Sequence, residues 1–121
     1  MLVGTGIDII EFNRFRNLKD KGDFVRQVLT ENEIGIALRR SNQDIFYATA
    51  FAVKEAILKA LGCGLHDGSH WHEVELNDRW ETRLSGRLAA LASQQSVTVI
   101  HSSQSCTENC VVALVLLENN D

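Results

Sequence analysis

The sequence predicts an α+β domain in which a small, mainly antiparallel sheet packs with a long central helix. Three observations support this fold class. Apolar residues alternate over 2–10, recur at helical spacing over 43–61, and alternate again over 96–102 and 109–118. With 121 residues and no proline, the chain can bury one modest core and has no proline-marked linker. We therefore expect a single domain over 1–121.

The first expected strand, residues 2–10, has glycines and an aspartate on one face. Its two faces carry Val3, Thr5, Ile7 and Ile9 on one side and Gly4, Gly6, Asp8 and Ile10 on the other. Glycines weaken a strand, but they let another backbone or a ligand come close. Residues 11–26 are expected to be helical or irregular, with a break at Gly22. A capping-box sequence at 30–33 then starts a helix that runs to about Arg40.

The strongest helical pattern covers 43–61 and follows Ser41 or Asn42 as its cap. Its core row is Phe46, Ala50, Val53, Ile57 and Leu61, and the glycines at 62 and 64 end it. The later elements are a strand over 72–77, a helix from its cap Ser85 to Ala92, and the two closing strands. The expected order is β-α-α-α-β-α-β-β.

Composition excludes several classes of protein. A net charge of −4 argues against a protein that coats nucleic acid. The longest apolar run, residues 110–117, is too short to cross a membrane, and no secretory signal is recognisable, so we expect a cytoplasmic protein without membrane contact. Cys63, Cys106 and Cys110 form no C-x-x-C pair and are expected to be reduced thiols. The histidines at 66, 70 and 72 match no metal motif and indicate a polar surface loop.

Asp8 is the first candidate for chemistry, because an unpaired carboxylate among apolar residues and glycines is costly to bury. It must meet solvent, a cation or a metal. Glu55 and Lys59 lie on a second stripe of the long helix, and Ala48 and Ala52 occupy the first half of the same stripe. Asp8 and Glu55 could supply the two carboxylates that Mg²⁺ typically takes from protein, with Lys59 near phosphate oxygens. The alternative is an ordinary i,i+4 surface ion pair between Glu55 and Lys59.

Three segments carry a family resemblance. They are Gly6-Ile7-Asp8-Ile9-Ile10-Glu11 followed by Arg14, then Phe51-Ala52-Val53-Lys54-Glu55-Ala56 with Lys59-Ala60-Leu61-Gly62-Cys63-Gly64, and finally Val97-Thr98-Val99-Ile100-His101-Ser102. In order, spacing and total length they resemble the motifs of bacterial holo-[acyl-carrier-protein] synthases, the small 4′-phosphopantetheinyl transferases. The second segment is similar to the family pattern (W/F)-x-x-K-E-A-x-x-K closed by Gly-Thr-Gly.

The resemblance implies transfer of the phosphopantetheine arm of coenzyme A to a serine hydroxyl of an acyl carrier protein, with release of adenosine 3′,5′-bisphosphate. It implies that Asp8 and Glu55 bind Mg²⁺. It also implies that Lys59 contacts a phosphate of coenzyme A and has a role in proton transfer. Further coenzyme A contacts are implied at Gly62, Cys63, Gly64 and His101. It also implies a homotrimer with active sites between subunits. The carrier would belong to fatty acid biosynthesis, within lipid metabolism, or to secondary metabolism.

The resemblance further implies that the carrier protein docks on the basic first helix, at Arg14. Residues 13–27 hold five basic and two acidic side chains, in a chain whose total charge is negative. Such a local patch suits steering toward an acidic partner. The alternative interpretation is an ordinary solvated helix face.

The sequence departs from the family pattern at several positions. Ala50 stands where the family usually has an arginine, Cys63 replaces threonine, Ile100 replaces serine, and residues 77–82 replace a Gly-Lys-Pro segment. Arg39 and Arg40 are candidates for the missing phosphate contact. These departures motivate an alternative function, a catalytically impaired homologue that binds carrier protein or nucleotide as a partner or regulator. A structural domain without a ligand would leave Asp8 unexplained.

Overall fold

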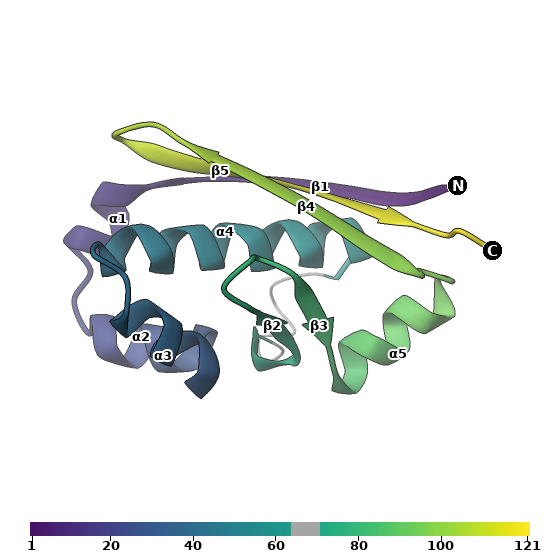
Figure 1. Ribbon diagram of the computed structural model, residues 1–121, viewed down its shortest axis with the longest axis horizontal. Helices are drawn as coiled ribbons and strands as arrows, with labels where there is room; N and C mark the ends of the chain where they lie inside the picture. Colours follow the sequence, from purple (N-terminus) through teal and green to yellow (C-terminus); the bar gives the residue numbers. More distant parts are fainter. Residues whose placement is uncertain (64–70) are drawn as a thin grey trace.

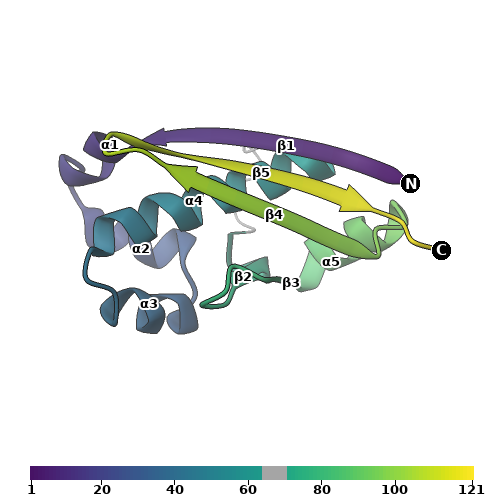
Figure 2. The same cartoon turned by 45° about the horizontal axis from the view of Figure 1, so that its top comes forward.

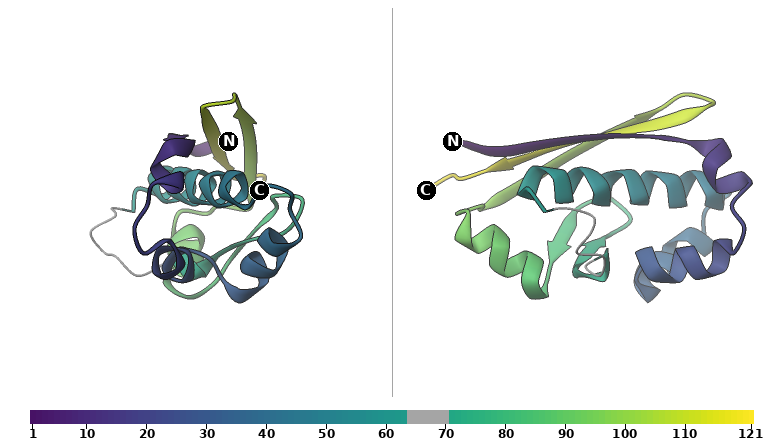
Figure 3. Two further views of the ribbon diagram at one scale, coloured as in Figure 1. Left: turned by 90° about the vertical axis from the view of Figure 1, so that its left-hand side faces the viewer. Right: turned by 180° about the vertical axis from the view of Figure 1, so that it is seen from behind.

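The computed structural model describes residues 1–63 and 71–121, and it confirms the α+β architecture. Its elements in chain order are β1 (Leu2–Glu11), α1 (Phe12–Arg16), α2 (Lys21–Val28), α3 (Glu31–Leu38), α4 (Gln43–Leu61), the 3₁₀ turn η2 (Trp71–Glu73), β2 (Val74–Leu76), β3 (Thr82–Leu84), α5 (Gly86–Gln94), β4 (Val99–Cys106) and β5 (Cys110–Glu118). The main sheet covers one side of α4, and the shorter helices and the β2–β3 hairpin cover the other (Figure 1). The middle layer is therefore α4, which the end-on view in Figure 3 also shows.

The main sheet is antiparallel, with the strand order β1-β5-β4 (Figure 2). Asp8 on β1 lies opposite Ala113 of β5, and Gln104 of β4 lies on the other side of Ala113. His101 of β4 lies opposite Leu116, so it belongs to the other face of the sheet than Asp8. The first and last motifs of the sequence thus lie on opposite edges of the sheet.

The long helix α4 has the predicted bounds. The Asn42 side chain accepts a hydrogen bond from the N–H of Ile45 at its start, and Gly62 ends it with a left-handed φ of 75°. Both the core row and the alanines of the second stripe are buried, because layers cover the helix on two sides. Within the described residues, no helix combines the length and the apolar character needed to cross a membrane.

A fully buried ion pair fixes the side of α4 that faces away from the sheet. Lys54 Nζ donates hydrogen bonds to Glu33 Oε1 (2.7 Å), to the carbonyl of Val28 (2.6 Å) and to that of Trp71 (3.0 Å). Glu33 in turn accepts from the N–H groups of Thr30 and Leu76. All three ammonium protons have partners, and α2, α3, α4, η2 and β2 are tied together.

Strand β1 lies in direct contact with the backbone of α4. A Cβ placed on Gly4 would be 2.4 Å from the carbonyl oxygen of Ala60, and one on Gly6 would be 1.9 Å from that of Ala56. Any side chain at either position would force the strand away from the helix. The close approach expected from these glycines is therefore made by a backbone.

Several local expectations from the sequence were wrong. Gly22 lies inside α2, and the break falls at 17–20, where Asp20 adopts a left-handed φ of 55°. The helix predicted to run to Arg40 ends at Leu38, although its capping box is confirmed. The short strand β3 was not predicted, and β2 and β4 begin later than expected, at Val74 and Val99.

The N-terminus of α5 is capped differently from the prediction. Ser85 occupies the capping position, but its side chain makes no capping hydrogen bond. Instead, Oε1 of Glu73 in η2 accepts a bond from the N–H of Leu88. A long-range contact thus replaces the local one.

The contact between β1 and α4 can be tested with two glycine-to-alanine substitutions. We expect Gly6→Ala to lower the free energy of unfolding by about 3 kcal/mol or more, because its Cβ meets a helix carbonyl rather than a movable side chain. Gly35→Ala in α3 is the control, since a Cβ there meets nothing within 4 Å. It should raise stability by about 0.5–1 kcal/mol. Denaturant unfolding measures both, and equal stability of Gly6→Ala and wild type would contradict the contact.

Candidate active site

Strand β1 and helix α4 bring together Asp8, Glu55 and Lys59, the three residues predicted to carry chemistry. Lys59 Nζ donates to Asp8 Oδ1 at 2.9 Å and to the carbonyl of Ile7 at 3.0 Å. Within the described parts of the chain, the ion pair of Lys59 is thus made with Asp8 and not with its helix neighbour Glu55. The alternative of a simple i,i+4 pair was wrong, because the strand lies closer to the ammonium group than the sequence alone indicates.

Burial and the neighbouring carboxylate of Asp8 both disfavour the charged form of Glu55. Burial, and next the charge of Asp8, raises the pKa of Glu55 above its ordinary value, while Lys59 and Arg14 act in the opposite direction. Asp8 Oδ2 is buried and has no hydrogen-bond partner among the described residues. A buried carboxylate oxygen without a partner is costly, and a cation would remove that cost.

This donor set fits a divalent cation that keeps part of its water shell. Across residues 1–63 and 71–121, no group of three or more His, Cys, Asp or Glu side chains could hold a metal on its own. Asp8 and Glu55 could supply two oxygen ligands, and water or phosphate would supply the rest. Mg²⁺ is typically bound in proteins in this way.

The turn after α4 contributes less than the sequence indicated. The N–H of Gly62 donates to the carbonyl of Lys59 at 3.0 Å, and that of Cys63 donates to the carbonyl of Leu58 at 2.8 Å. These bonds close the end of the helix, so neither N–H group is free to bind a phosphate. Gly64, the third residue of the predicted turn, lies outside the described residues, as do His66 and His70.

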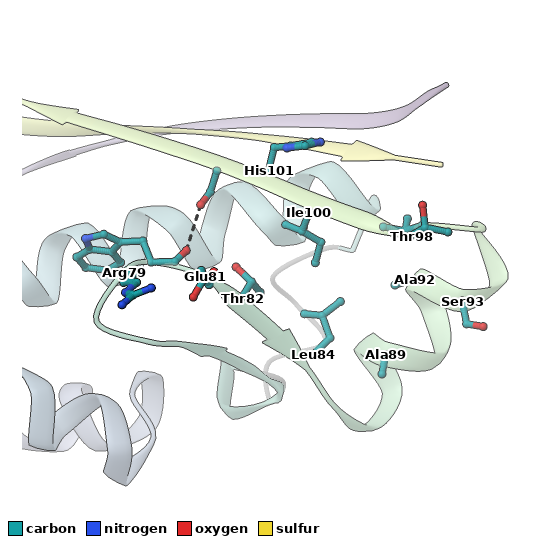
Figure 4. A pocket seen from close by; sticks show the side chains of 13 residues that line it. Arg79, Glu81, Thr82, Leu84, Ala89, Ala92, Ser93, Thr98, Ile100 and His101 are labelled. Carbon is teal, nitrogen blue, oxygen red and sulfur yellow. Dashed lines mark hydrogen bonds between the residues drawn. The ribbon is translucent and has the colours of Figure 1, made fainter. Parts of the chain in front are cut away.

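His101 does not join the Asp8 group within one chain. It lies on β4, two strands away from β1, which is roughly 10 Å at the usual strand spacing. Its Nε2 lies 2.9 Å from Glu118 Oε1, and this bond lowers the pKa of Glu118. His101 is among the residues around a pocket of about 640 Å³ between β3, β4 and α5, but its ring lies on the other side of β4 from Ile100 and Leu84 (Figure 4).

Two of the five basic side chains in the segment 13–27 form ion pairs among the described residues. Lys21 pairs with Asp44, and Arg26 pairs with Asp23. Arg14 is exposed, and its guanidinium lies over the ring of Phe51, 5.4 Å from the centroid. The charge of Arg14 also opposes the rise that burial causes in the pKa of Glu55.

The arginines considered as replacements at the nucleotide side do not reach the pocket that contains His101. Arg40 donates to the carbonyl of Asp78 at 3.2 Å and lies over the ring of Phe46, and neither it nor Arg39 lines that pocket. Sequence reasoning missed Arg79, which does line it. The available signal was its place in the segment that replaces Gly-Lys-Pro.

Residues 4–115 match the family described as the 4′-phosphopantetheinyl transferase superfamily. The holo-[acyl-carrier-protein] synthase of Geobacter sulfurreducens is 38% identical to this chain over 124 residues, which cover 98% of both proteins. That of Halalkalibacterium halodurans is 37% identical over 123 residues, covering 98% of this chain and 97% of the other.

Solved structures give the same result. The Neisseria meningitidis holo-[acyl-carrier-protein] synthase has a TM-score of 0.87 and 26% identity, covering 98% of this chain and 100% of that one. The Bacillus anthracis synthase, in complex with CoA (3′,5′-ADP), has a TM-score of 0.76 and 34% identity, with 99% of each chain covered. The chain therefore belongs to the 4′-phosphopantetheinyl transferase superfamily. Within it, the chain is an enzyme of the holo-[acyl-carrier-protein] synthase family.

The raised pKa of Glu55 predicts an unusual effect of pH on the metal-free protein. Above the ordinary glutamate pKa, the folded state binds more protons than the unfolded state, so this group lowers stability as the pH rises toward its folded pKa. We expect Glu55→Gln to be more stable than wild type at neutral pH, with an advantage that shrinks as the pH falls toward the ordinary range. Unfolding in chelator across a pH series measures this. A constant loss of stability at every pH would contradict it.

Proposed function

We propose that this protein transfers the 4′-phosphopantetheine group of coenzyme A to a serine hydroxyl of an apo acyl carrier protein, in a Mg²⁺-dependent reaction that releases adenosine 3′,5′-bisphosphate. The observation that carries the proposal is the buried Asp8 Oδ2 near Glu55, which has no hydrogen-bond partner in residues 1–63 and 71–121, with the Lys59 ammonium 2.9 Å from Asp8 Oδ1. The relatives are named as synthases of the holo-acyl carrier protein, and one of their structures contains CoA (3′,5′-ADP), so these molecules are the substrates we propose. This arrangement supplies the chemistry that those substrates need.

The reaction forms a bond between the serine oxygen and phosphorus and breaks the bond from that phosphorus to the bridging oxygen of the diphosphate. That oxygen leaves with adenosine 3′,5′-bisphosphate, and the serine hydroxyl loses its proton. Asp8 and Glu55 would hold Mg²⁺, which when bound neutralises charge on the diphosphate and orients it for in-line attack. Lys59 adds a fixed positive charge on the same side, because Asp8 and the carbonyl of Ile7 hold its ammonium. Its side chain is about half exposed, so a phosphate oxygen can reach it.

A homotrimer with sites between subunits accounts for the separation of the two halves of the site. The Asp8 group lies at one edge of the sheet and the pocket of His101 at the other, so one chain does not bring them together. The outer face of the sheet is also apolar and uncovered in the single chain: Ile7, Ile9 and Leu114 are 57%, 63% and 43% exposed. A subunit seated on this face would bury it.

Light scattering tests this assembly. We expect wild type at micromolar concentration to have about three times the chain mass of 13.5 kDa. Leu114→Glu should dissociate it, because a charge would enter the apolar contact. Leu38→Glu, at an exposed leucine of α3 away from the sheet, should leave the mass unchanged. A monomeric wild type would refute the proposal.

Mass spectrometry of an apo carrier protein tests the transfer itself. With coenzyme A and Mg²⁺, the carrier should gain one phosphopantetheine, and chelator should stop the gain. Asp8→Asn and Glu55→Gln should each lower the rate about a hundredfold or more, since each removes a charge at the reacting centre. Asp23→Asn, at an exposed ion pair, is the control and should act as wild type. Near-normal transfer by both site variants would refute the metal assignment.

The same measurement separates the second candidate function. The changes at Ala50, Cys63 and Ile100 favour a homologue that binds carrier protein or nucleotide without turnover. That protein would form a stable complex with the carrier and add no mass to it. If each enzyme molecule modified many carrier molecules, a homologue without turnover would be excluded.

We further propose that Arg14 docks the acidic carrier protein. Arg14→Gln should raise the KM for carrier roughly tenfold and leave the KM for coenzyme A nearly unchanged, because charge at an interface rim acts on encounter. Added salt should weaken the wild-type reaction more than that of the variant. Arg26→Gln is the control, since Asp23 already balances that arginine. Equal loss of affinity for both substrates would instead assign Arg14 to the nucleotide or metal side.

A further inference from the structure

The pocket that contains His101 has two chemically different ends. Arg79 lies at one end, whereas Ala89 and Ala92 of α5 lie at the other, with Leu84 and Ile100 beside them (Figure 4). A planar, weakly polar ring suits the apolar end, and an anion suits the arginine. The pocket therefore fits a nucleotide-like ligand with a phosphate group.

Among the described residues, the guanidinium of Arg79 has no partner. Within the parts of the chain that the structure describes, no hydrogen bond or ion pair holds it, whereas Arg83 pairs with Glu75 and Arg40 is bonded to a carbonyl. The acidic residue nearest in sequence, Glu81, also lines the pocket, but its Oε1 accepts a hydrogen bond from the Asn77 side chain. Among the described residues, Arg79 is thus a cation at the pocket without an internal partner.

The turn that carries Arg79 is held firmly. The N–H of Arg79 donates to Asn77 Oδ1 at 2.9 Å, and the N–H of Glu81 donates to the same oxygen. Next to it, Trp80 adopts a left-handed φ of 64°, stacks on Phe46 with ring centroids 5.1 Å apart, and accepts a hydrogen bond at its carbonyl from Ser102. The turn is anchored to α4 and β4, so the backbone of Arg79 has a fixed position at the rim of the pocket.

A second polar group of the same pocket lacks a partner. Thr82 Oγ1 is buried and makes no hydrogen bond among the described residues. Unsatisfied buried hydroxyls are uncommon in folded proteins, and a bound ion or water is one of the partners that can satisfy them. The position next to the arginine turn supports an anion or its bound water as that partner.

We propose that Arg79 binds the 3′-phosphate of coenzyme A, in place of the arginine that the family usually carries where this chain has Ala50, a residue fully buried in α4. The inference rests on the proposed function. Two of the three phosphates of coenzyme A form the diphosphate at the bond that breaks, so they belong with Asp8, Glu55 and Lys59. The remaining 3′-phosphate needs another cation, and an arginine fork can bind it through two N–H groups.

Binding of two unreactive nucleotides tests the inference without turnover. Titration calorimetry in chelator compares adenosine 3′,5′-bisphosphate with adenosine 5′-monophosphate, which differ only in the 3′-phosphate. We expect wild type to prefer the bisphosphate about ten- to a hundredfold. Arg79→Gln should bind both equally, at the level of the monophosphate. Arg87→Gln, at an exposed arginine of α5 that does not line the pocket, should keep the wild-type preference.

Kinetics separate failure of this inference from failure of the proposed function. Arg79→Gln should raise the KM for coenzyme A about tenfold or more and leave the KM for dephospho-coenzyme A unchanged, with a wild-type circular dichroism spectrum. If Arg79→Gln kept the full preference for the 3′-phosphate while wild type transfers normally, the inference alone would be overturned. If wild type neither bound the bisphosphate nor modified a carrier, both would be overturned.

Discussion

Contact between two backbones, strand β1 and helix α4, determines where the site carboxylates lie. A Cβ on Gly4 or Gly6 would clash with the carbonyl oxygen of Ala60 or Ala56, so only glycine allows the strand to lie this close to the helix. Because Asp8 follows Gly6 on the same face of the strand, and Glu55 precedes Ala56, this contact brings both acids together. The arrangement is unfavourable by itself: one oxygen of Asp8 has no partner among the described residues, and the pKa of Glu55 is raised. Local cost of this kind is typical of functional sites, where the surrounding structure maintains it.

The opposite side of α4 supplies the support that such a site needs. Lys54 directly precedes Glu55 and points into the other layer, because successive helix residues are rotated by about 100°. Lys54 forms a buried ion pair with Glu33 and bonds to the carbonyls of Val28 and Trp71. These contacts fix the orientation of α4 about its own axis. Burial lowers the pKa of Lys54, while Glu33 opposes that change. Removing one member of such a pair typically costs about 3–5 kcal/mol, since the other charge stays buried.

Patterns that depend on neighbours in sequence predicted much of the fold. The bounds of α4, the capping box at Thr30 and the glycine face of β1 follow from periodicity and local hydrogen bonding, and the structure confirms them. The errors arose where distant segments compete with local ones. Lys59 bonds to Asp8 rather than Glu55, and Glu73 replaces Ser85 as the cap of α5. Arg79 has no hydrogen-bond or ion-pair partner among the described residues and lies in a turn held by α4 and β4, and no spacing in the sequence reveals either feature.

We propose that Asp8 and Glu55, brought together by the glycine contact, share one divalent cation. Anomalous diffraction from crystals of the wild-type protein grown with Mn²⁺ in place of Mg²⁺ tests it most directly, because the metal is located without reference to activity. We predict an anomalous peak within bonding distance of both Asp8 Oδ2 and a carboxylate oxygen of Glu55, with Lys59 still beside Asp8 Oδ1. A peak elsewhere in the protein, with both carboxylates unliganded, would contradict a cation shared by Asp8 and Glu55.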